Sequence, residues 1–169
     1  LPTIDTVYKK GKVITLPFKN GERLILKDTT YQAEYTPTRS YNVMLHQGFP
    51  STFMVSESMF FTDEMFTVLS QKTGDTLQQF RGYPHMSPTK KYTVAVFPEF
   101  ECMQDTYVVV NHLKDGKYEN YASFRVQSWS YPYKLDKNNT PVDHFSIDWI
   151  SPTEFILYAF GLISPEFIA

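Results

Sequence analysis

Residues 87–96 read Ser-Pro-Thr-Lys-Lys-Tyr-Thr-Val-Ala-Val, a polar turn followed directly by β-branched and aromatic residues. The phrase returns at 151–158 as Ser-Pro-Thr-Glu-Phe-Ile-Leu-Tyr, and more loosely at 36–45 as Thr-Pro-Thr-Arg-Ser-Tyr-Asn-Val-Met-Leu. In each copy the proline fixes φ beside hydroxyl residues that favour turns, and the residues that follow favour extended backbone. The recurring phrase therefore predicts turns that each begin a β-strand.

Turns that contain glycine separate further strand-like runs along the chain. These pairs of runs are 12–16 and 23–26 around Gly21, 65–69 and 76–80 around Gly74, and 107–110 and 122–126 around Gly116. Glycine tolerates the positive φ that tight hairpin turns need, so each pair predicts a β-hairpin. Residues 145–149 alternate apolar and polar side chains, which indicates a strand with one buried face.

Helical patterns are sparse by comparison. Only 58–66 fits a turn or two of helix, and its aromatic residues fit a strand as well. We therefore expect an all-β fold over 1–169, formed as a single antiparallel domain. A propeller-like arrangement, a sandwich or curved sheet built from hairpins, and a small barrel all fit this pattern.

The composition of the chain limits the function classes open to it. Aromatic residues make up 17% of the chain, which supports a β-rich fold with large buried side chains. The net charge of -2 gives no electrostatic reason to expect nucleic acid, so we expect no nucleic-acid partner. No apolar run reaches the roughly 18–20 residues that cross a bilayer, so no transmembrane segment is expected. The chain opens at Leu1, so a signal or a lipid anchor would lie in a part that precedes it.

Two segments resemble a known family. Residues 82–92, Gly-Tyr-Pro-His-Met-Ser-Pro-Thr-Lys-Lys-Tyr, resemble the Ser-Pro-Asp-Gly-Lys turn in blades of propellers related to the Tol-system periplasmic protein, and 148–153 resemble its tryptophan-containing variant. Thr89 and Thr153 stand where that family usually has aspartate, and Lys90 and Glu154 where it usually has glycine. The chain as a whole also resembles small secreted or lipid-anchored envelope domains of Bacteroidota. These resemblances imply blade-like sheets and a location outside the cytoplasm, in the periplasm or the cell envelope.

Residues that carry catalytic or metal-binding chemistry form no recognisable motif. The histidines at 46, 85, 112 and 144 lack the close spacing that places two ligands on one metal, so we expect no metal site. Cys102 is the single cysteine and follows Glu101, whose charge disfavours a thiolate. There is no Gly-x-Ser-x-Gly and no phosphate-binding glycine loop, so no serine nucleophile and no cofactor are expected.

A group of aromatic residues gives the strongest indication of function. Phe124, Trp129, Tyr131 and Tyr133 lie in or beside a predicted surface loop over 131–143. Aromatic side chains on a surface offer large contact area at low entropic cost, which suits recognition of a protein. The sequence therefore favours a non-catalytic binding module outside the cytoplasm, with these four residues contacting a protein partner.

Other functions stay open at this point. The chain fits a small hydrolase in which His85, Glu99, Glu101 and His144 converge in a pocket, since Glu99 and Glu101 would share one face of a strand. It also fits an immunity-type inhibitor that binds a partner enzyme, or a structural component of the envelope.

Overall fold

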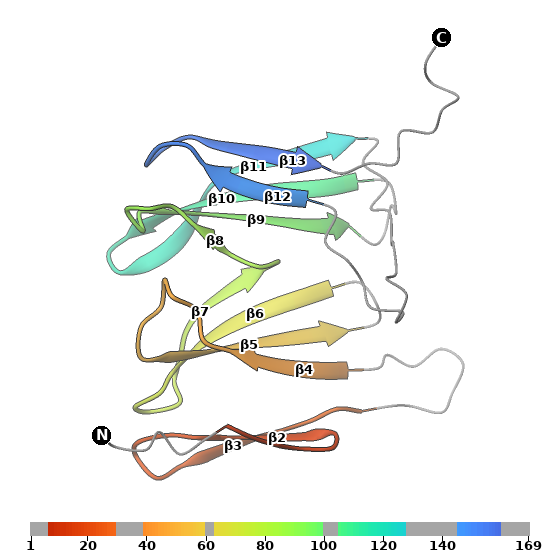
Figure 1. Ribbon diagram of the computed structural model, residues 1–169, viewed down its shortest axis with the longest axis vertical. Coiled ribbons are helices and arrows are strands. Elements are labelled where there is room, and N and C mark those ends of the chain that lie inside the picture. Colours follow the sequence, from red (N-terminus) through yellow and green to blue (C-terminus); the bar gives the residue numbers. More distant parts are fainter. Residues whose placement is uncertain (1–6, 30–38, 60–62, 100–104, 128–144, 160–169) are drawn as a thin grey trace, which may run out of the picture.

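The computed structural model describes residues 7–29, 39–59, 63–99, 105–127 and 145–159, and these residues form thirteen β-strands and no helix (Figure 1). Every strand pairing joins neighbours in the chain and is antiparallel. The expectation of an all-β, antiparallel fold is therefore confirmed. The segment 58–66 belongs to two strands wherever it is described, so the strand interpretation is correct there and the helical one is wrong.

The strands form four sheets in chain order. Sheet 1 contains β1 (Tyr8–Lys10), β2 (Val13–Pro17) and β3 (Arg23–Lys27). Sheet 2 contains β4 (Arg39–Met44), β5 (Thr52–Met59), β6 (Asp63–Ser70) and β7 (Thr76–Arg81). Sheet 3 contains β8 (His85–Met86), β9 (Tyr92–Glu99), β10 (Asp105–Lys114) and β11 (Lys117–Gln127), and sheet 4 contains β12 (Phe145–Trp149) and β13 (Phe155–Ala159).

The sheets lie face to face in a stack, from sheet 1 at the bottom of Figure 1 to sheet 4 at the top. Successive side chains of a strand point to opposite faces, so an inner sheet supplies apolar residues to two interfaces. Phe53 and Val55 of β5 pack with Ile14 and Leu16 of sheet 1, whereas Met54 packs with residues of the interface to sheet 3. None of the four sheets closes into a barrel, so that alternative is wrong for the described residues. The propeller arrangement stays a prediction.

The interface between sheets 3 and 4 is rich in valine. Four valines of β9 and β10 are buried there: Val94, Val96, Val108 and Val110. They pack against Ile147, Trp149, Phe155 and Leu157 of sheet 4. The alternation predicted for 145–149 is therefore confirmed, because Ile147 and Trp149 point inward while Asp148 is exposed.

The Ser-Pro-Thr phrase begins a strand in the two described copies. The first copy connects β8 to β9, and its Ser87 side chain accepts a hydrogen bond from the backbone N–H of Tyr92 at 3.1 Å. The second copy connects β12 to β13, where the N–H of Thr153 donates to the Ser151 hydroxyl at 3.2 Å. The turn part of the loosest copy, 36–38, lies outside the described residues.

Candidate functional site

Of the four aromatic residues predicted to bind a partner, the structure describes Phe124. Trp129, Tyr131 and Tyr133 fall within 128–144, outside the described residues, as does the loop predicted at 131–143. Phe124 lies in β11, where it pairs with Val108 of β10. Its side chain is 55% exposed.

The exposure of Phe124 follows from its place at the edge of sheet 3. Phe124 and Val108 are directly paired, so they share one face of the sheet. Val108 is only 4% exposed because sheet 4 covers it. The described strands of sheet 4 leave Phe124, one strand further out, uncovered. Phe124 thus extends a buried apolar face into solvent.

A second exposed aromatic residue, Tyr121, lies three positions before Phe124. Between β10 and β11 the register shifts, since Val110 pairs with Ala122 whereas Asn111 pairs with Asn120. Tyr121 is therefore the extra residue of a β-bulge, a feature that redirects a side chain. It is 69% exposed. The bulge is not visible in the sequence, which explains why this residue was missed.

The ring of Tyr121 contacts two further rings. Its centroid lies 6.1 Å from that of Tyr92 and 6.2 Å from that of His112, and the last two are 4.9 Å apart. We call Tyr92, His112, Tyr121 and Phe124 the aromatic edge. The rings of Tyr92, His112 and Tyr121 hold one another in position, so part of this surface is ordered before any contact with a partner.

The residues of the hydrolase alternative are only partly described. His85 lies in β8, with its ring 5.1 Å from that of Tyr83. Glu99 ends β9, whereas Glu101 and His144 lie outside the described residues. Cys102 lies outside them as well. Within the part of the chain that the structure describes, no group of three or more His, Cys, Asp or Glu side chains is arranged to hold a metal ion.

His46 is held as a neutral imidazole between sheets 2 and 3. Its Nδ1 accepts a hydrogen bond from the Gly48 N–H at 3.0 Å, so the proton is on Nε2, which donates to the Pro84 carbonyl at 3.1 Å. Burial lowers the pKa of His46, and the bond to Pro84 opposes this shift without cancelling it. Both ring nitrogens are thus committed to the backbone, which suits a structural role.

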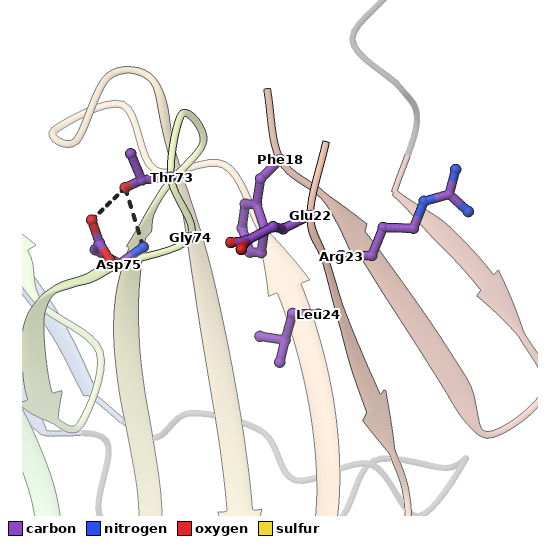
Figure 2. Close-up of a pocket in the computed structure, with 7 residues that line it drawn as sticks. All are labelled: Phe18, Glu22, Arg23, Leu24, Thr73, Gly74 and Asp75. Carbon is purple, nitrogen blue, oxygen red and sulfur yellow. Dashed lines mark hydrogen bonds between the residues drawn. The ribbon is translucent and has the colours of Figure 1, made fainter. Parts of the chain in front are cut away.

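A cleft between sheets 1 and 2 is the second candidate site (Figure 2). It has a volume of about 470 Å³ and lies between the β2–β3 turn and the β6–β7 turn. Its lining comprises Phe18, Glu22, Arg23, Leu24, Thr73, Gly74 and Asp75. Both turns were predicted from their glycines, Gly21 and Gly74, but their contact was not.

Hydrogen bonds between the two turns position the cleft. The backbone N–H groups of Lys19 and Asn20 donate to the carbonyls of Gln71 and Lys72, at 2.9 and 3.1 Å. The Asn20 side chain adds a third bond, from Nδ2 to the Thr73 carbonyl at 3.2 Å. The walls of the cleft are therefore connected directly.

Comparison with protein-family models, with curated proteins and with solved structures finds no match to this chain. No helix in the described residues is long and apolar enough to cross a membrane. The described residues thus offer two candidate binding surfaces, the aromatic edge and the cleft.

Proposed function

We propose that this protein is a non-catalytic binding module that contacts a protein partner through its aromatic edge. The observation that carries the proposal is the exposure of Phe124 and Tyr121, 55% and 69%, on an edge strand of sheet 3. Aromatic side chains contribute most of the binding energy in many protein interfaces, because each buries a large area while few torsions become fixed. Trp129, Tyr131 and Tyr133, which the sequence predicts to contact the same partner, follow Phe124 in the chain.

The composition of the aromatic edge supports a protein partner, and the likeness of residues 82–92 to a known turn supports the proposed location. The aromatic edge combines apolar rings with the polar atoms of His112 and Tyr121, a mixture typical of protein interfaces. The likeness of 82–92 to periplasmic propeller turns supports a place in the periplasm or cell envelope. An immunity-type inhibitor that covers a partner enzyme is one form of this function.

Site-specific photo-crosslinking tests the proposal in the native host. A photoreactive phenylalanine analogue replaces Phe124 in one variant, Tyr121 in a second, and Ile25, which is 66% exposed on sheet 1, in a control. We expect one dominant protein adduct from positions 121 and 124 and none of it from position 25. Equal adducts from all three positions, or no adduct at 121 and 124, would contradict the proposal.

Binding to the purified adduct protein gives the quantitative test. Phe124→Ala and Tyr121→Ala are each expected to weaken Kd about tenfold, as truncation of an interface anchor does. Ile25→Ala is the matched control for loss of an exposed apolar side chain. An unchanged Kd for both aromatic variants would show that the partner binds elsewhere.

A further inference from the structure

The two ends of the stack each present a sheet face that no other described sheet covers (Figure 1). Sheet 1 packs on sheet 2 through Ile14 and Leu16, and sheet 4 packs on sheet 3 through Ile147 and Leu157. Successive side chains of a strand alternate between faces, so the neighbours of these residues point away from the stack.

The first of these surfaces belongs to sheet 1. Lys10 and Lys27 both pair with Val13, and Ile25 pairs with Thr15, so each set shares one face of the sheet. Figure 2 shows the Arg23 side chain directed away from sheet 2 as well. We call this surface outer face 1, formed by Lys10, Val13, Thr15, Arg23, Ile25 and Lys27.

Outer face 1 is basic. The two carboxylates of 7–29 belong to Glu22 and Asp28, and both lie on the side of sheet 2. Oδ1 of Asp28 accepts a hydrogen bond from the N–H of Tyr41 at 2.9 Å, and the Glu22 carboxylate lies beside the Phe18 ring in Figure 2. The three cationic side chains of outer face 1 form no ion pair with another described residue.

The second surface belongs to sheet 4. Asp148 pairs with Ile156 and Ser146 pairs with Tyr158, on the face opposite Ile147. The register continues by two further positions, where the N–H of Ile150 donates to the Glu154 carbonyl at 3.0 Å. We call this surface outer face 4, formed by Ser146, Asp148, Ile150, Glu154, Ile156 and Tyr158.

Outer face 4 is acidic and partly apolar. Residues 145–159 include Asp148 and Glu154 but no lysine or arginine. Neither carboxylate is in an ion pair with another described residue. Ile150, Ile156 and Tyr158 are exposed here, as Ile25 is on outer face 1. The two ends of the stack thus combine opposite charges with apolar side chains.

We propose that outer face 4 of one copy of this protein packs on outer face 1 of a second copy, so that the stack of sheets continues from copy to copy. Opposite charges meet in this arrangement, whereas a contact between two identical faces would bring like charges together. The faces lie at opposite ends of the stack in Figure 1, so the complement of each is supplied by another molecule. Such a head-to-tail contact forms a ring if its rotation closes and a filament if it does not.

This self-association goes beyond the proposed binding of a protein partner. It uses sheets 1 and 4, whereas the aromatic edge belongs to sheet 3, so either proposal can fail without the other.

Sedimentation of the purified chain tests the contact and its charges. We expect the average mass of the native chain to rise with concentration up to about 1 mM, and to rise less in high salt because exposed ion pairs are screened. One double variant, Lys10→Glu with Lys27→Glu, makes outer face 1 acidic, and another, Asp148→Lys with Glu154→Lys, makes outer face 4 basic. Each is expected to weaken self-association about tenfold, because two attractions become repulsions between exposed groups.

Mixing the two double variants gives the sharper test. Every face then has an oppositely charged face in the other variant, so an equimolar mixture should regain the association of the native chain. Lys91→Glu with Lys117→Glu is the matched control, because it makes the same change in net charge at two exposed lysines of the sheet 3 region and should leave association unchanged.

Three results would overturn the proposal. The first is a native chain that stays monomeric at all concentrations, and the second is a mixture that associates no better than its components. The third is weakening in only one of the two double variants, which would indicate a contact between identical faces. If a variant fails to fold, the photoreactive analogue at position 25 decides on native charges: it should cross-link a second copy of the chain within 145–159, and no such adduct would overturn the proposal.

Discussion

The interface between sheets 2 and 3 contains directional contacts, whereas that between sheets 3 and 4 is dominated by aliphatic packing. In the first, Gln78 of β7 binds the backbone of Tyr118 twice: Nε2 donates to its carbonyl at 3.0 Å, and Oε1 accepts from its N–H at 3.1 Å. Within sheet 3, the Tyr118 hydroxyl donates to the Lys90 carbonyl at 2.6 Å, which holds this residue at the interface. The rings of Phe49, Phe80 and Tyr118 then lie 5.7 to 5.8 Å apart.

The second interface packs valines against Trp149 and Phe155. Within the described residues the buried Nε1–H of Trp149 has no hydrogen-bond partner. Apolar contact is non-directional, so it tolerates small shifts that paired hydrogen bonds resist. The interface between sheets 2 and 3 therefore fixes how these sheets are placed, whereas the interface between sheets 3 and 4 leaves the aromatic edge exposed beside it.

Removal of a buried aromatic ring is expected to show the largest difference in stability between the two interfaces. Phe66 is 2% exposed between sheets 2 and 3, so Phe66→Ala is expected to lower the free energy of unfolding by about 3–5 kcal/mol. Phe155 is only partly buried, so Phe155→Ala should cost less. Urea unfolding of both variants measures the difference, and an equal loss would mean that the interfaces contribute alike.

A glycine at the crossing from sheet 2 to sheet 3 gives the next largest effect. Gly82 has φ +78°, and a Cβ there would lie 2.8 Å from the backbone oxygen of Val96. Gly116 has nearly the same φ, +81°, with nothing within 4 Å. Gly116→Ala therefore costs backbone strain alone, about 1–2 kcal/mol, and Gly82→Ala should cost more because β9 must move as well. Thermal unfolding of the pair checks this, and identical Tm values would argue against close contact at Gly82.

Removing the Tyr118 hydroxyl tests one directional bond. Tyr118→Phe keeps the ring and leaves the Lys90 carbonyl without this donor, so we expect a loss of about 1 kcal/mol. Tyr121→Phe is the control, because that side chain is 69% exposed and should change stability by less than about 0.5 kcal/mol. Chemical unfolding that shows no difference between the two variants would mean the bond contributes nothing net.

The smallest expected effect is a pH dependence centred on His46. Burial holds the pKa of His46 below the ordinary histidine value of about 6.5, so the unfolded chain binds more protons between the two pKa values, and stability rises with pH there. The contribution of the neutral ring is complete above about pH 6.5 and is lost as the pH falls below it. Urea midpoints from about pH 5 to pH 8 should therefore fall more steeply on acidification for the native chain than for His46→Gln. Parallel curves would refute a role for this ring.

The sequence predicted the elements well because hairpin turns and strand alternation are local signals. The runs around Gly21, Gly74 and Gly116 became the hairpins β2–β3, β6–β7 and β10–β11. Phe124 was identified as a candidate contact residue, and the structure describes it as exposed.

The features that the sequence did not predict depend on contacts between residues that are distant in the chain or on the register of strand pairing. Asn20 and Thr73 are 53 positions apart, and their bond arises because the two turns meet where sheets 1 and 2 stack. The exposure of Tyr121 depends on a register shift opposite Val110 and Asn111, which local propensity does not encode. Local sequence patterns therefore predict neither the cleft nor the full aromatic edge.

Because each strand hydrogen-bonds within its sheet only to a strand next to it in the chain, the contacts that build a sheet have short sequence separation. Such a topology lowers the loop-closure entropy of each pairing and speeds folding relative to interleaved β architectures. We expect each sheet to assemble soon after its residues leave the ribosome and to serve as the surface on which the following one condenses.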